Sequence, residues 1–502
     1  MKKFNLLIGM ILINFVSIIL GFLRDSSIVY KLGANQNSDA FIFITTLPIT
    51  LFSAIGWVVS TTFVPIYTHI KNNESEGNAN LFASNFLNIL FLIVTIIVVI
   101  LQLFRVQVIR ILAPGFNGET FQTVLNLASI ILPSMLCYVI TYCFVGILTS
   151  HKNLIWTSAI GIPTNLFLIL GILFFYNWYG LKGATEFSFI GSIAQFAMLI
   201  IPLKKIGFKY ITYINIRDSH ILEALKMIGP MIIGVMAIQI NSLVTSMIAS
   251  TLNPGTITSI NLGMKVNNSI YNSLVFIIIT YTFPFLAEAI SKKDIDKFNV
   301  LIYGGLQLVF LILLPIAVNL IFFRKEVITI LFGHGNFSGK NILTTSFILI
   351  FYSASLLFMG IKDLINRVFY ATKNTKTPMY NSIISICINI ILSIALAHYW
   401  GVYGLAASSA VATITAALLL YRSLIKGFDI ENKRILVMIL KIAIICLFLY
   451  VFLSLIKSIL AGKLILLAYF FVTGTLGVGF YIICLWIFKV DIKSLLSLFS
   501  KK

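Results

Sequence analysis

Residues 82–104 read FASNFLNILFLIVTIIVVILQLF and contain no charged side chain. A helix of about twenty apolar residues is long enough to cross the hydrocarbon core of a bilayer, so this stretch predicts a transmembrane helix. Thirteen other stretches share its apolar character. In chain order the fourteen stretches are 5–23, 40–66, 82–104, 121–150, 154–176, 184–203, 224–249, 257–288, 298–323, 341–365, 377–399, 402–425, 435–456 and 464–488.

These stretches leave almost no room for a soluble domain. The chain has 502 residues, of which 59% are hydrophobic and 10% are charged, and its mean hydropathy is +1.02. We therefore predict an all-α polytopic membrane protein with fourteen transmembrane helices. Its function should be exerted in or across the bilayer.

The net charge of +20 would suggest a nucleic-acid partner in a soluble protein. An even number of spans places both termini on the same side, and we expect that side to be the cytoplasm. The predicted cytoplasmic segments then carry more than twice as many Lys and Arg residues as the outer segments. This bias follows the positive-inside rule. The basic charge is therefore explained by membrane orientation, and we expect no nucleic-acid partner.

An internal repeat organises the chain at an offset of 221 residues. The matching pairs are Val106-x-x-Ile109 with Val327-x-x-Ile330, Phe116-x-Gly118 with Phe337-x-Gly339, Lys152-Asn153 with Lys373-Asn374, and Gly180-x-x-Gly183 with Gly401-x-x-Gly404. Each match occupies the same place relative to the predicted helices. We therefore predict an N-terminal lobe of helices 1–6 (1–220), a C-terminal lobe of helices 7–12 (221–430), and an additional helix pair 13–14 (431–502).

Six helices per lobe is an even number, so both lobes should enter the membrane from the same side. Such lobes are related by an axis along the membrane normal, and the binding site is expected between them near the midplane. This arrangement is typical of an alternating-access carrier.

The connections argue against an enzyme that modifies a lipid-linked sugar, which is the alternative from a different class of function. The longest outer connections, 105–120 and 324–340, are too short for a catalytic domain. No P-loop is present, so we expect no hydrolysis of ATP by this chain. The five cysteines fall inside predicted spans without metal-ligand spacing, and we predict neither a metal site nor a cofactor.

A polar stripe interrupts the eighth stretch. Asn261, Lys265, Asn268 and Asn272 follow one another at spacings of four, three and four, which places them on one face of a helix. Ionisable groups inside a span are functional candidates. We predict that this stripe lines an aqueous cleft, although Lys265 could instead extend to the membrane interface.

Three further charges lie at the junction of the first two stretches. Arg24 and Asp25 end the first stretch and Asp39 opens the second. They could form a local salt-bridge cluster at the outer surface. In the functional interpretation Arg24 is a cationic clamp, partly balanced by Asp39, because the planar guanidinium binds phosphate oxygens in a bidentate manner. A cleft lined by Arg24 and Lys265 implies an anionic substrate and disfavours a cation or drug exporter.

Several motifs resemble the MurJ/MviN family of lipid II flippases. They are Gly21-Phe-Leu-Arg24-Asp25, Leu32-Gly-Ala-x-x-x-Ser-Asp39-Ala-Phe41, Leu47-Pro48, Phe63-Val-Pro65-Ile66, Ala113-Pro-Gly-Phe116, Phe369-Tyr-Ala-Thr-Lys-Asn374-Thr-Lys-Thr-Pro378 and Gly404-Leu-Ala406. The motifs cover helices 1–12 in the family's order and spacing. The resemblance implies the fold of the multidrug/oligosaccharidyl-lipid/polysaccharide exporter superfamily.

The resemblance also implies the substrate and the location. Lipid II, the undecaprenyl-diphosphate-linked peptidoglycan precursor, would move from the cytoplasmic to the outer leaflet of the bacterial cytoplasmic membrane through a monomer. Family cavity residues correspond to Arg24, Asp39 and Lys265, and helices 13–14 would form a groove for the polyprenyl tail. Ile18 and Phe52-Ser53 stand where the family commonly has arginines. A flippase for another polyprenyl-linked oligosaccharide therefore remains the alternative.

The source of energy is a separate prediction. The central parts of predicted spans 7, 11 and 12, where some members of the superfamily bind sodium or protons, contain no Asp or Glu. We therefore expect the membrane potential to act on the cationic cleft, at about 2.3 kcal/mol per charge per 100 mV.

Overall fold

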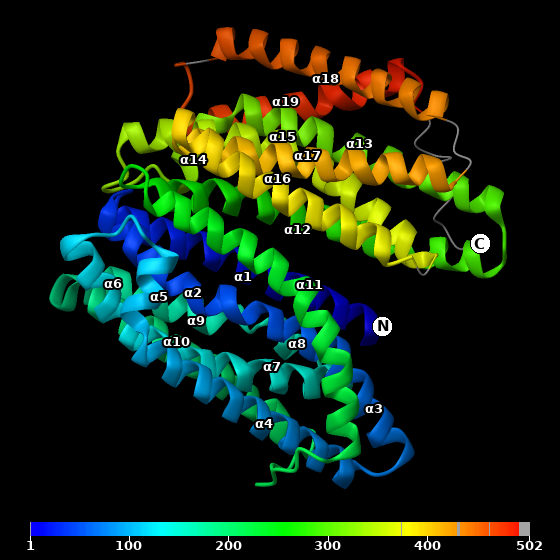
Figure 1. The fold of residues 1–502 in the computed structure, drawn as a ribbon. Helices are drawn as coiled ribbons and strands as arrows, with labels where there is room; N and C mark the ends of the chain where they lie inside the picture. Colours follow the sequence, from blue (N-terminus) through cyan, green and yellow to red (C-terminus); the bar gives the residue numbers. More distant parts are fainter. Residues whose placement is uncertain (1, 373, 429–431, 461, 491–502) are drawn as a thin grey trace. The chain divides into compact units, whose positions relative to one another are not determined.

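The computed structural model describes residues 2–372, 374–428, 432–460 and 462–490, and every regular element in these ranges is a helix (Figure 1). The predicted all-α class is confirmed. The α-helices are α1 (Lys2–Leu32), α2 (Gln36–Val58), α3 (Val64–Asn73), α4 (Glu76–Leu103), α5 (Arg105–Leu112), α6 (Gly118–Ile131), α7 (Ser134–Ser150), α8 (Leu154–Ser158), α9 (Gly161–Leu170), α10 (Tyr176–Lys205), α11 (Ser219–Ser250), α12 (Thr256–Ser291), α13 (Ile295–Phe322), α14 (Arg324–Phe332), α15 (Gly339–Ala371), α16 (Lys376–Trp400), α17 (Val402–Gly427), α18 (Asn432–Leu460) and α19 (Leu466–Ile487). Two π-helical segments, Val59–Phe63 and Gly171–Phe175, join α2 to α3 and α9 to α10.

The chain forms two compact units. One comprises Met1–Thr258 together with His334–Phe337, and the other comprises Ser259–Gly333 with Ser338–Lys502. In the first unit α10 packs on α7 and α9, α4 packs on α7, and α11 packs on α2. In the second unit α15 packs on α13 and α17, and the pair α18–α19 contacts α13 and α14. This division by contacts differs from the predicted repeat bounds of 1–220, 221–430 and 431–502, which remain a prediction.

Within the described ranges, nine helices are long and apolar enough to span a membrane, or ten if the bent pair α6–α7 forms one span. The range Leu154–Lys205, which has 52 residues, is counted as one of these nine helices. At 1.5 Å per residue it would be about 78 Å long, more than twice the thickness of the hydrocarbon core. It therefore contains two spans. The total of fourteen remains a prediction.

A helical hairpin divides Leu154–Lys205 at Gly180, where φ is 58° and ψ is −149°. The two arms run back along each other, because a Cβ at Gly171 would contact Phe187 and one at Gly191 would contact Phe167. A positive φ of this kind suits glycine, which has no Cβ to clash with the backbone. Gly180 lies between the predicted spans 154–176 and 184–203 and folds the second back against the first.

The repeat places an equivalent hairpin in the second unit. Gly401 has φ 56° and ψ −131° between α16 and α17. Ser393 Oγ lies 2.7 Å from Ser408 Oγ across the two arms. The second glycine of the motif is needed for close approach, because a Cβ at Gly404 would overlap the carbonyl group of Leu396. The repeated Gly-x-x-Gly motif therefore encodes one tight turn and one close contact.

The other repeat matches also occupy equivalent local structures. Asn153 N donates to Leu148 O and Asn374 N donates to Phe369 O, each at 2.9 Å, so the same bond ends both helices. Likewise Phe116 N donates to Ala113 O, and Phe337 N donates to His334 O. Lys373 lies outside the described residues.

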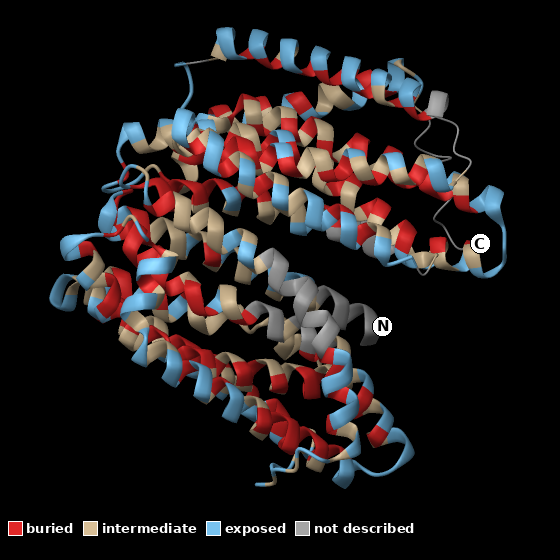
Figure 2. Ribbon diagram, in the orientation of Figure 1, coloured by how far each residue is buried: buried red, intermediate tan, exposed pale blue. Residues whose placement is uncertain are grey.

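Several helices have long exposed faces (Figure 2), and many of the exposed side chains are large and apolar. On α4 the exposed side chains include Phe91, Leu92, Ile96, Val99, Ile100 and Leu103. On α18 they include Leu436, Leu440, Leu447, Val451, Leu455 and Ile459. Contiguous apolar surfaces of this extent are stable in contact with lipid rather than water. The protein is a multi-pass membrane protein.

Candidate functional site

Arg24 lies inside the first transmembrane helix. The prediction that this span ends at residue 23 is wrong, because α1 continues to Leu32 and the apolar span comprises Gly9–Leu32. Arg24 is therefore eight residues, or roughly 12 Å, before the end of the helix. A charge at this depth is expensive unless it has a partner or faces an aqueous space.

Arg24 forms an ion pair with the next residue, Asp25. Arg24 Nη2 lies 2.6 Å from Asp25 Oδ1, and Nε donates to the same oxygen at 2.8 Å. The side chains are 26% and 13% exposed. The pair is thus neutralised but reachable, and an anion that approaches Arg24 would compete with a neighbouring carboxylate.

Asp39 has a different position from the one we predicted. Its carboxylate is buried, and it accepts hydrogen bonds from Gly255 N at 2.7 Å, Thr258 N at 2.8 Å and Thr258 Oγ1 at 2.7 Å. These donors belong to the first turn of α12 and the residue before it. Unsatisfied N–H groups and the helix dipole make a helix N-terminus a favourable place for a carboxylate. Asp39 on α2 therefore caps α12, whereas Asp25 pairs with Arg24.

Two loops of the first unit make reciprocal contacts with helix ends. Asn336 N donates to Tyr30 O at 2.9 Å, at the end of α1. Gly115 N donates to Ser250 Oγ at 3.2 Å, at the end of α11. Gly335 and Gly115 must lack a side chain, since a Cβ at either position would overlap the backbone of the helix end that it touches. The Ala-Pro-Gly-Phe motif at 113–116 thus serves close packing.

The predicted polar stripe forms a distinct face of α12. Asn261, Lys265 and Asn268 are half-buried and Asn272 is exposed. The neighbouring residue Val266 is buried, on the packed side of the helix. Lys265 belongs to the second unit and Arg24 to the first. Their joint role as substrate-binding residues therefore remains a prediction.

A cluster of charged residues on α15, which comprises Lys362, Asp363 and Arg367, was not identified from the sequence. Lys362 Nζ lies 3.8 Å from Asp363 Oδ1, and Tyr271 OH of α12 donates to Asp363 Oδ2. Arg367 Cζ lies 5.7 Å from the ring centroid of Phe283. The signal in the sequence is a lysine–aspartate pair within the stretch 341–365, where charges are otherwise absent.

Among the described residues, no group of three or more His, Cys, Asp or Glu side chains could hold a metal ion.

Known proteins resemble this chain in sequence. The family model described as lipid II flippase MurJ matches residues 28–474. A protein named probable lipid II flippase MurJ from Buchnera aphidicola subsp. Baizongia pistaciae is 28% identical over 447 residues, which cover 87% of this chain and 86% of the relative. The lipid II flippase MurJ of Thermosipho africanus is 27% identical over 429 residues, 84% of this chain and 85% of the relative.

Solved structures show the same fold. A lipid II flippase MurJ in an inward closed conformation matches with a TM-score of 0.82 and 27% identity, over 97% of this chain and 99% of that one. An inward-facing multidrug resistance transporter of the MATE family and MOP superfamily matches with a TM-score of 0.69 and 15% identity, over 84% and 95% of the two chains. The second likeness shows only the shared fold. The family model covers most of the chain, and the chain therefore belongs to the MurJ family of lipid II flippases.

Proposed function

We propose that this protein transfers lipid II from the cytoplasmic to the outer leaflet of the bacterial cytoplasmic membrane by alternating access. Membership of the MurJ family supports the substrate. The observation that carries the mechanism is Arg24, a partly exposed arginine that lies roughly 12 Å before the end of the first transmembrane helix and is paired with Asp25.

The diphosphate of lipid II loses hydration when it enters a low-dielectric cleft, and it needs compensating charge. Arg24 can exchange Asp25 for phosphate oxygens, because its guanidinium presents a planar fork of N–H donors. Asp25 then serves as the resting counter-ion that keeps the empty site neutral. Lys265 supplies the second cation on the proposed polar face of α12.

The other proposed site residues act on the uncharged part of the substrate or on the site's geometry. Three asparagines lie on the same face of α12 as Lys265, and their side-chain amides offer hydrogen-bond donors and acceptors to sugar or peptide groups. They are Asn261, Asn268 and Asn272. Asp39 acts indirectly, because it holds the first turn of α12, the helix that carries this face. Both termini are proposed to lie in the cytoplasm, and the protein is proposed to act as a monomer that needs no cofactor.

Depletion of the protein in its host cell tests this function. Lipid II accessible at the outer surface should fall, while total lipid II is maintained or increases. If exposure of lipid II is unchanged, the substrate assignment is wrong. Loss of a different undecaprenyl-diphosphate-linked glycan from the surface would then support the alternative, a flippase for another polyprenyl-linked oligosaccharide. That alternative arises because Ile18, Phe52 and Ser53 stand where the family commonly has arginines.

A further inference from the structure

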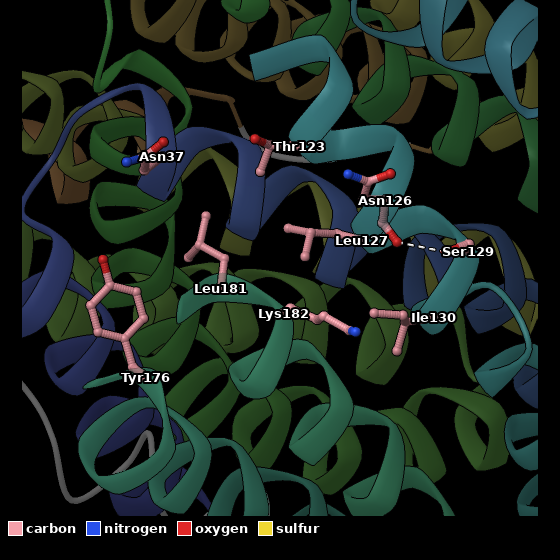
Figure 3. Close-up of a pocket in the computed structure, with 9 residues that line it drawn as sticks. All are labelled: Asn37, Thr123, Asn126, Leu127, Ser129, Ile130, Tyr176, Leu181 and Lys182. Atoms are coloured by element: carbon pink, nitrogen blue, oxygen red, sulfur yellow. Dashed lines mark hydrogen bonds between the residues drawn. The ribbon is translucent and has the colours of Figure 1, made fainter. Parts of the chain in front are cut away.

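A pocket of about 760 Å³ lies within the first unit, between α2, α6 and α10 (Figure 3). Its lining residues are Asn37, Thr123, Asn126, Leu127, Ser129, Ile130, Tyr176, Leu181 and Lys182. In the proposed orientation these elements face the outer side of the membrane. The volume is in the range of sites that enclose a small organic ligand, about 300–1,000 Å³.

The pocket is built on packed elements. Thr123, Leu127 and Ile130 follow one another at spacings of four and three, so they lie on one face of α6, which packs on both α2 and α10. The Gly180 hairpin brings Tyr176 and Lys182 from its two arms to the same pocket.

The lining combines neutral polar groups with an apolar floor. Within the described part of the chain, the side chains of Asn37, Thr123, Asn126 and Tyr176 form no hydrogen bond with another residue, so their donors and acceptors are available to a ligand. Leu127 is buried beneath them. Sugars present hydroxyl edges and apolar ring faces, and a set of amide, hydroxyl and aromatic groups beside leucine matches both.

The charge of the pocket selects among polar ligands. Lys182 is the one charged residue of the described lining, and its nearest described counter-ion, Glu186, is 3.9 Å away in an exposed pair. An exposed pair of this kind contributes little energy, so the ammonium group can turn to a ligand. A single cation beside neutral groups suits a carbohydrate with an attached acidic group. It does not suit an inorganic cation, which would require carboxylate ligands.

We infer that this pocket binds the carbohydrate part of an acidic glycolipid at the outer surface, as a product-side site distinct from Arg24 and Lys265. The inference rests on the proposed function, because the head group of lipid II combines two amino sugars with an attached peptide that carries carboxylate groups. The site would retain the head group after transfer, while the diphosphate leaves the cationic residues. It would disfavour return of the substrate to the cytoplasmic side.

Binding of a soluble muropeptide tests this inference without the diphosphate. The probe is N-acetylglucosaminyl-N-acetylmuramyl peptide, titrated against purified full-length protein in nanodiscs and followed by saturation-transfer NMR and calorimetry. We expect the wild-type protein to bind it, and we expect Asn126→Ala and Lys182→Gln each to weaken binding at least tenfold. Asn78→Ala removes another exposed amide outside the pocket and is the matched control.

Three outcomes would overturn the inference. The wild type could fail to bind the muropeptide, or the Asn126 and Lys182 variants could bind it equally well. Alternatively, these variants could lose binding of phosphatidylglycerol vesicles but keep binding of the muropeptide, which would identify a phospholipid site. The test is separate from that of the proposed function: normal lipid II exposure after depletion would reject flipping even if the pocket variants lose glycan binding. Conversely, proven flipping with unaltered glycan binding in the variants would reject only the pocket.

Discussion

Arg24 and Asp25 are consecutive residues that form an ion pair within an apolar helix. We expect Arg24→Ala to abolish or severely reduce function, because it removes the phosphate-binding fork and leaves Asp25 without its described partner. Arg24→Lys should restore only part of the activity, since an ammonium group cannot bind phosphate in the same bidentate way. Complementation of a depletion strain measures the effect, and membrane insertion is checked by immunoblot. Full complementation by Arg24→Ala would exclude Arg24 from the substrate site.

Lys265 is the second cation of the proposed site. Lys265→Ala should severely reduce function, whereas Lys265→Arg should retain more activity because charge matters at this position more than shape. The same complementation assay applies. Lys226→Ala and Lys441→Ala are controls, since neither lysine belongs to the proposed site and both are predicted to extend their long side chains to the interface. Equal activity of Lys265→Ala and these controls would contradict the prediction.

Asp39 holds the start of a helix through three described hydrogen bonds to a buried carboxylate. Each hydrogen bond to a charged group contributes about 1.5–3 kcal/mol, so Asp39→Ala should lower the melting temperature markedly and impair transport. Asp39→Asn should be intermediate, because it keeps one acceptor. The control is Asp294→Ala, which removes a local cap of α13 with a single described bond. Equal melting temperatures for the Asp39 and Asp294 alanine variants would show that the cap does not stabilise the fold.

At the scale of elements, the paired helices depend on the two glycines of each repeated motif. We expect Gly404→Ala to reduce the yield and melting temperature more than Gly401→Ala. The first change forces a Cβ against the backbone of Leu396, whereas the second only places alanine at φ +56° in open space. Gly401→Ala should still lower the melting temperature, because φ 56° with ψ −131° is a conformation that glycine adopts far more readily than an L-residue.

Gly479→Ala is the control for this comparison, because Gly479 lies within α19 with no other atom near its added Cβ. That substitution should be neutral or slightly stabilising, since alanine favours a helix more than glycine does. If Gly404→Ala unfolds at the same temperature as Gly479→Ala, the close approach of α16 and α17 is not required.

The C-terminal helix pair can be tested in the whole molecule. The pair is joined to the rest of the second unit by the Lys457–Glu326 ion pair at 3.2 Å and by a hydrogen bond from Tyr481 OH to Leu311 O. Deletion of residues 435–502 should leave the twelve-helix core inserted but impair transport of a substrate with a full-length polyprenyl tail. Transport in proteoliposomes with full-length and short-tailed lipid II measures this. Normal transport of the long-tailed substrate by the truncated protein would reject the tail groove.

Hydropathy was sufficient to predict the helical membrane fold, because an apolar stretch is a local property of the sequence. The repeat located the two Gly-x-x-Gly motifs but did not predict the hairpins that they form. The end of α1 was predicted wrongly, since Arg24 and Asp25 resemble the polar end of a span when their mutual neutralisation is not known. The partner of Asp39 was out of reach for a different reason: Gly255 and Thr258 lie more than two hundred residues away in the chain. The pocket draws on three separate elements and has no continuous motif.

The contacts of Gly115 with Ser250 and of Gly335 with Tyr30 are related by the repeat to within one residue. Two identical chains that form a closed dimer make contacts of this kind, in which each copy provides the surface that it also receives. Duplication and fusion of a six-helix gene would preserve such an exchange inside a single polypeptide. Fusion also frees the two contacts to diverge: Gly115 N now donates to a serine hydroxyl group, and Asn336 N donates to a backbone carbonyl group. In a symmetric dimer any substitution would change both contacts at once, whereas in a single chain each contact can change alone.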